Sequence, residues 1–139
     1  MTAVADKLPP IQADPEIRGD PYRVLLVCQL LNRATGTVAR RVLPEVLRRW
    51  PTARVMATAD PEELAEALRP LGFPNRRARL LRDMARQMAL GWWEHPEDLP
   101  GVGPYGADAY AIFVDGRLDV EPEDRVLRAW VRALREGAE

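Results

Sequence analysis

The chain has 139 residues, of which 47% are hydrophobic and 29% charged, and its formal net charge is −1. This length fits one domain with its own core, and no apolar run approaches the roughly 20 residues that span a bilayer. The single cysteine, Cys28, and the single histidine, His95, predict no disulfide framework, no iron–sulfur cluster and no zinc site. No basic and apolar leader opens the chain, so we expect a cytoplasmic protein, nucleoid-associated if prokaryotic, with no membrane partner.

The basic side chains are almost all arginine, since Lys7 is the only lysine. Arginines gather in residues 40–49 and 76–86, whereas acidic side chains gather in residues 60–66 and 115–124. Two interpretations remain open: solvated helix faces, or a polarised surface that binds phosphates.

The first half of the chain reads as an irregular arm followed by helices. Residues 1–19 hold several prolines without sustained periodicity. Asp20-Pro21 is typical of a helix N-cap with proline at the first helical position. The helix over 21–32 is apolar nearly all round, which predicts a central, buried position. Further helices are predicted over 38–49, 51–58 and 60–68.

The second half begins with a Pro/Gly-punctuated loop at 70–74 and continues in helices. We expect an Arg-rich amphipathic helix over 75–91, a short turn at 96–99, and helices over 105–114 and 123–136. No strand pair is indicated, so the predicted fold class is all-α. We expect residues 20–139 to form a single domain and residues 1–19 an N-terminal arm.

The motif with the most chemical content is Leu99-Pro100-Gly101-Val102-Gly103. Glycines at 101 and 103 permit positive φ and a close approach of another backbone. The backbone N–H groups of such a turn, at the start of a helix, can bind a phosphate without regard to base sequence. An ordinary helix–helix turn is the alternative interpretation.

The ordered motifs resemble the helix-hairpin-helix DNA glycosylase superfamily that includes endonuclease III. Within it, the chain is most similar to the glycosylase domain of methyl-CpG-binding thymine/uracil DNA glycosylases. The resemblance covers about residues 20–135 and rests on segments that occur in the same order and at nearly constant spacing. These include Asp20-Pro21-Tyr22, Leu31-Asn32-Arg33, Thr58-Ala59-Asp60, Pro70-Leu71-Gly72, Gly103-Pro104-Tyr105-Gly106 and Pro122-Glu123-Asp124.

The resemblance implies that Asp124 is the catalytic carboxylate, stabilising positive charge on the deoxyribose and orienting water. A helix N-cap is the alternative role for Asp124. The nearby acids Asp115, Asp119, Glu121 and Glu123 are expected to form a solvated rim. Bifunctional relatives carry a lysine where this chain has Tyr105, which predicts a monofunctional enzyme that leaves an abasic site.

The resemblance also implies roles in DNA and base binding. Tyr105 is expected to line the base pocket, together with Asp14 or, with a shift of register, Gln12. Arg33 is expected to enter the space that the extruded base vacates, and Leu71 and Phe73 to form a wedge. The hairpin residues Pro100, Gly101, Val102, Gly103 and Gly106 are expected to hold the strand. A Na⁺ or K⁺ ion on the backbone carbonyls of Glu97, Leu99 and Val102 is a further expectation, and no other cofactor is predicted.

The expected substrate is double-stranded DNA with a mispaired or damaged base, uracil or thymine opposite guanine being favoured. Two alternatives stay open: another lesion such as a 5-substituted uracil, or a non-catalytic helix-hairpin-helix DNA-binding module. We expect a monomer whose product passes to abasic-site repair enzymes.

Overall fold

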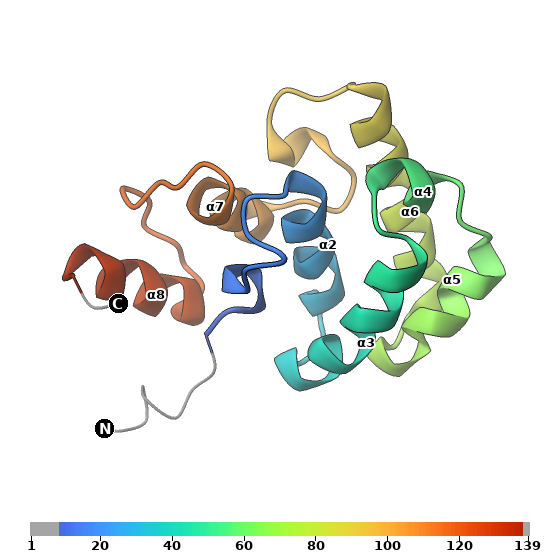
Figure 1. Ribbon diagram of the computed structural model, residues 1–139, viewed down its shortest axis with the longest axis horizontal. Helices are drawn as coiled ribbons and strands as arrows, with labels where there is room; N and C mark the ends of the chain where they lie inside the picture. The colour runs from blue at the N-terminus through green and yellow to red at the C-terminus, as the bar shows by residue number, and fades with distance from the viewer. Residues whose placement is uncertain (1–8, 138–139) are drawn as a thin grey trace.

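The computed structural model describes residues 9–137, and the described part contains helices and no strand. Figure 1 shows how these elements are arranged. The α-helices are α2 (Pro21–Leu31), α3 (Gly36–Arg49), α4 (Ala53–Ala57), α5 (Pro61–Leu68), α6 (Pro74–Leu90), α7 (Pro104–Phe113) and α8 (Arg125–Arg135). Short 3-10 helices are η1 (Ile11–Ala13), η2 (Arg69–Leu71) and η3 (Pro96–Asp98). The predicted all-α fold class is confirmed.

Side-chain caps set where most of the helices begin. Asp20 accepts a hydrogen bond from the Arg23 N–H at 3.0 Å, and Asp60 accepts one from the Glu63 N–H at 3.0 Å. Thr35 caps α3, so this helix begins at Gly36, two residues before the predicted start. Asp124 caps α8, which therefore begins at Arg125 and not at Glu123. A cap satisfies an N–H group that the first turn of a helix leaves without a partner.

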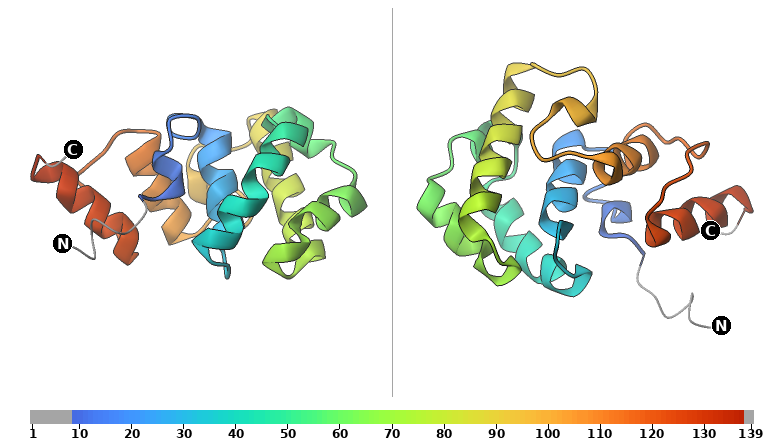
Figure 2. Two further views of the ribbon diagram at one scale, coloured as in Figure 1. Left: turned by 60° about the horizontal axis from the view of Figure 1, so that its bottom comes forward. Right: turned by 180° about the vertical axis from the view of Figure 1, so that it is seen from behind.

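Helix α2 forms the centre of the molecule, as its continuous apolar sequence predicts. Its residues 24–27 are almost completely buried. Helices α3 and α6 pack against α2 on one side, and α7 packs against it on the other (Figures 1 and 2). Helices α4 and α5 complete the first side by packing on α6. Helix α2 therefore lies between α3 and α6 on one side and α7 on the other.

The N-terminal segment is better packed than the predicted irregular arm. Ile11, Gln12 and Ile17 are buried, and the Gly19 N–H donates to the Phe113 carbonyl at 2.8 Å. The segment passes between α2 and α8 (Figures 1 and 2). From residue 9 onward it belongs to the folded domain, whereas residues 1–8, with Lys7, lie outside the described residues.

Helix α8 lies at the end of the molecule opposite α5 (Figure 1). It is anchored by buried Leu127 and Val131, and the Trp130 ring lies 6.3 Å from that of Phe113. This contact packs the middle of α8 against the end of α7. None of the helices within residues 9–137 is long and apolar enough to cross a membrane.

Candidate active site

A cleft of about 1,060 Å³ opens where the N-terminal segment, the end of α2, the hairpin and the starts of α7 and α8 meet. Most of the residues predicted to act in the site line this cleft. They are Gln12, Arg33, Gly101, Val102, Gly103, Tyr105, Gly106 and Asp124. The fold therefore brings together positions that are up to 112 residues apart in the sequence.

Asp124 caps α8, one of the two roles that the sequence left as alternatives, and it also lines the cleft. One carboxylate oxygen, Oδ2, accepts the Leu127 N–H at 3.0 Å and caps α8. The other oxygen makes no hydrogen bond within residues 9–137, and the half-buried side chain lines the cleft. The cap holds the carboxylate in one orientation, so that its second oxygen is available to a bound group.

Three polar side chains meet on the inner wall of the cleft. Gln12 Nε2 lies 2.8 Å from the Tyr105 hydroxyl oxygen and 3.5 Å from Cys28 Sγ, and donates to both. Burial raises the pKa of the Tyr105 phenol, and it raises the pKa of the Cys28 thiol to about 12. Both groups are therefore neutral at physiological pH. Gln12 Oε1 is buried and has no hydrogen-bond partner within the described residues.

Cys28 is a member of this wall that the sequence did not place in the site. It is indeed buried, yet it also lines the cleft. Gln12 and Tyr105 are 93 residues apart, and no local pattern could have joined them to Cys28.

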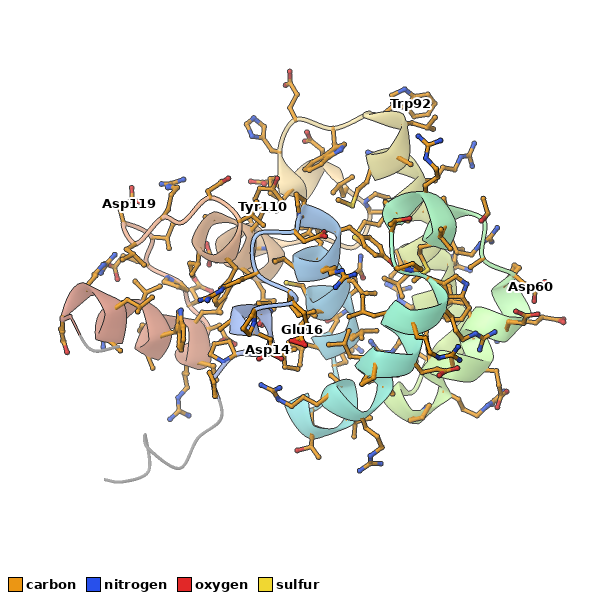
Figure 3. The ribbon with its side chains drawn as sticks, in the orientation of Figure 1. Asp14, Glu16, Asp60, Trp92, Tyr110 and Asp119 are labelled. Atoms are coloured by element: carbon orange, nitrogen blue, oxygen red, sulfur yellow. The ribbon has the colours of Figure 1, made fainter. Side chains whose placement is uncertain are left out.

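Asp14, the first candidate for the base pocket, does not line the cleft. Its carboxylate lies 3.4 Å from Arg40 Nη1 and forms an ion pair there. Figure 3 shows Asp14 on the N-terminal segment close to Glu16. The 3-10 turn η1 directs Gln12 inward and ends before Asp14. Of the two candidates that the sequence left open, Gln12 lines the cleft and Asp14 does not.

The hairpin is fixed to α2 through Gln29. Gln29 Nε2 donates to the Pro100 carbonyl at 2.9 Å, and a Cβ atom on Gly101 would lie 2.4 Å from that nitrogen. Gly101 has φ +80°, as predicted. Gly103 has φ −113° and is the N-cap of α7, so it does not use the positive φ that glycine permits.

The carbonyls expected to bind a monovalent cation lie on this same turn. The Val102 N–H donates to the Leu99 carbonyl at 3.2 Å, whereas the Val102 carbonyl accepts no hydrogen bond from residues 9–137. Backbone carbonyls are oxygen ligands of the kind that a hard cation takes, and the Val102 carbonyl is free to act as one.

A second cavity, of about 560 Å³, lies beside the cleft and is lined by Arg33, Phe73 and Arg76, among others. Arg33 has φ 57° and Phe73 has φ 50°, and no other non-glycine residue in the described chain has positive φ. Phe73 is 60% exposed, as a wedge requires. Leu71 is only 6% exposed and packs in the core, so its predicted role as a DNA-contacting wedge is wrong.

Arg77 holds the loop that carries Phe73, a role that sequence reasoning missed. Its guanidinium donates to the carbonyls of Gly72 at 2.7 Å, Leu71 at 3.1 Å and Gln29 at 3.2 Å. Arg77 is buried, and burial lowers its pKa. One side chain thus connects the Phe73 loop to the end of α2.

The acidic side chains of residues 115–124 lie in two different environments. Asp119 pairs with Arg117 and Glu121 with Arg135, and neither lines the cleft. Glu123 does line it, and so does Asp108. Burial, followed by the charges of Glu123 and Glu97, raises the pKa of Asp108.

The site thus combines an all-helical fold, a hairpin, a cap-held aspartate and a polar-walled cleft. Residues 28–132 match the model of the HhH-GPD superfamily of base excision DNA repair proteins, and the chain belongs to this family.

Individual relatives agree with this assignment. The chain is 35% identical over 117 residues to the methyl-CpG-binding domain protein 4-like protein of Arabidopsis thaliana, covering 84% of this chain and 26% of that one. It is 32% identical over 122 residues to a thymine-DNA glycosylase of Aeropyrum pernix, covering 83% and 53%. The chain thus spans between about a quarter and about half of the length of these relatives.

A solved structure supports the fold. The structure of a thermostable thymine-DNA glycosylase aligns with a TM-score of 0.67 and 24% identity, covering 73% of this chain and 50% of that one. At this identity the match establishes the helical architecture.

Proposed function

We propose that this chain is a monofunctional DNA glycosylase that removes uracil or thymine opposite guanine and leaves an abasic site. The observation that carries the proposal is the cleft that Asp124, Tyr105 and Gln12 line together with the hairpin. Family membership supports a role in base excision repair.

The proposed chemistry centres on the free oxygen of Asp124. Cleavage of the N-glycosidic bond builds positive charge on the deoxyribose ring, and a carboxylate beside that ring stabilises it. The Leu127 N–H fixes the other oxygen at 3.0 Å, so Asp124 does not have to reorganise as the charge develops. The same carboxylate can orient a water molecule toward the sugar.

Gln12 supports the choice of base. Its Nε2 is used by Tyr105 and Cys28, which leaves Oε1 as an acceptor without a partner. Uracil and thymine carry a donor at N3, whereas cytosine carries an acceptor there. An unpaired buried acceptor costs about 1–3 kcal/mol, and an N3–H group reached by rotation of the Gln12 amide would remove that cost.

Two exposed residues are suited to hold the duplex open. Extrusion of a base costs a few kcal/mol, and side chains that fill the gap offset this cost. Arg33 and Phe73 are exposed, and each lies in a strained left-handed conformation. We assign Arg33 to the vacated space and Phe73 to the wedge, with the hairpin on the neighbouring phosphate. A Na⁺ or K⁺ ion on the carbonyls of Glu97, Leu99 and Val102 would strengthen that phosphate contact.

The lysine content supports hydrolysis without strand cleavage. Strand cleavage through an imine needs an amine nucleophile, and a protonated guanidinium cannot serve as one. Tyr105 occupies the hairpin-helix position where bifunctional relatives are expected to carry lysine, and residues 8–139 contain no lysine. The abasic product would pass to enzymes that process such sites.

A duplex with a single G·U or G·T pair, treated with alkali after incubation, tests the proposal. We expect a break at the mispaired base, loss of that break in Asp124→Asn, and no protein–DNA adduct after borohydride. Urea unfolding of Asp124→Asn separates a lost carboxylate from a lost helix cap. Tight binding without an alkali-labile site on any lesion would instead identify a non-catalytic module.

A further inference from the structure

The side chain of Arg40, on α3, spans the short helix η1 that carries Gln12. Its Nη2 donates to the Pro9 carbonyl at 2.9 Å, and its Nη1 lies 3.4 Å from Asp14 Oδ2. Pro9 and Asp14 lie on either side of η1 in the sequence. We propose that Arg40 is a positioning residue, which holds η1 through Pro9 and Asp14 and so keeps Gln12 in the wall of the base pocket. The inference rests on the proposed function, because it assumes that Gln12 meets the extruded base.

The backbone of η1 is poorly attached to the rest of the fold. The hydrogen bonds that form it run from the Ala13 and Asp14 N–H groups to carbonyls of residues 10 and 11, within the same segment. A single turn of 3-10 helix is not stable alone. The next backbone N–H that donates to another helix is that of Gly19, on α7. Side chains must therefore fix the position of η1.

Within the described chain, only two residues connect residues 9–15 to helices α2–α8 by hydrogen bonds. One is Gln12 itself, through Cys28 and Tyr105, and the other is Arg40. Gln12 is completely buried, and its Oε1 has no partner. An unpaired buried acceptor disfavours the buried position of the side chain, so contacts other than those of Gln12 have to hold η1 against the cleft.

An arginine is suited to hold two separate acceptors at once. Its guanidinium is planar and rigid, and it presents several N–H donors in a fixed geometry. The Arg40 and Asp14 side chains are each 30% exposed, so solvent screens their ion pair only in part. The next residue, Arg41, is exposed, makes no hydrogen bond or ion pair with residues 9–137 and does not line the cleft. Arg41 is therefore a matched control for the loss of one positive charge from α3.

Amide hydrogen exchange in the free protein tests whether Arg40 holds η1. We expect Arg40→Ala to speed exchange of the Ala13 and Asp14 N–H groups by about 5- to 30-fold, the effect of losing a partly exposed ion pair and a charge-assisted hydrogen bond. Exchange in α2 should not change. Arg41→Ala should leave exchange at both amides as in wild type. These measurements need no DNA, so they do not depend on glycosylase activity.

Binding to uncleaved DNA tests whether Arg40 acts through Gln12. One duplex carries 2′-fluoro-2′-deoxyuridine opposite guanine, which keeps the base and resists hydrolysis, and the other carries a tetrahydrofuran abasic analogue there. The ratio of the two affinities measures contacts with the base. Gln12→Ala and Arg40→Ala should each lower this ratio by about 2- to 13-fold, which is the worth of one hydrogen bond. The double variant should lower it no further than Gln12→Ala does, because the two residues act as a unit.

Three results overturn the inference. The first is unchanged exchange at Ala13 and Asp14 in Arg40→Ala. The second is equal weakening of binding to both duplexes, which would identify Arg40 as a phosphate contact. The third is an additive loss in the double variant, which would indicate a general effect on the fold. A different result marks a failure of the proposed function alone: exchange that depends on Arg40, in a wild-type protein that binds both duplexes equally well.

Discussion

Replacing Gly101 by alanine would test how the hairpin is attached to the central helix. Gly101 has φ +80°, and a Cβ atom there would lie 2.4 Å from Gln29 Nε2. That nitrogen is the donor that holds the Pro100 carbonyl at 2.9 Å. The substitution therefore imposes backbone strain and also displaces Gln29 from its hydrogen bond.

The expected loss of stability is the sum of these two effects. A non-glycine residue in the left-handed region costs roughly 1–2 kcal/mol. Loss of one buried hydrogen bond costs about 0.5–1.5 kcal/mol. We expect the free energy of unfolding of Gly101→Ala to fall by about 1.5–3.5 kcal/mol, measured by urea denaturation.

Gly103→Ala is the matched control on the same turn. Gly103 has φ −113°, and a Cβ atom there would meet nothing within 4 Å. Its unfolding free energy should stay within about 0.5 kcal/mol of wild type. Gly101→Ala combined with Gln29→Ala should keep the strain and lose the clash. Equal stabilities for the two single glycine variants would refute the reasoning.

Three further predictions concern stability. Arg77→Met leaves carbonyls on the Phe73 loop without a donor, so urea unfolding should show a loss of roughly 3 kcal/mol or more, against little change for exposed Arg76→Met. Burial raises the pKa of Cys28 to about 12, above its unfolded value near 8.5, so the folded state retains the proton. Stability should be constant below about pH 8.5 and fall by about 1–2 kcal/mol by pH 10, a decline that Cys28→Ala should reduce. Asp20→Ala removes the cap of α2 and should cost about 1 kcal/mol in thermal or urea unfolding.

Local sequence rules determined most of the helices. Asp20-Pro21 and Asp60-Pro61 begin helices where predicted, because an N-cap followed by proline acts within a few residues. The position of α2 at the centre also follows from its own apolar residues. The family motifs located the hairpin and Asp124 without any spatial information.

The tertiary structure decided which neighbours share a site. Gln12 and Asp14 are equally polar and two residues apart, yet only Gln12 reaches Tyr105, because η1 turns it inward. Leu71 and Phe73 are equally apolar, yet Leu71 is buried and Phe73 exposed, because the Arg77-bound loop turns between them. Both choices depend on contacts between segments distant in sequence, and residue type and local spacing do not encode such contacts.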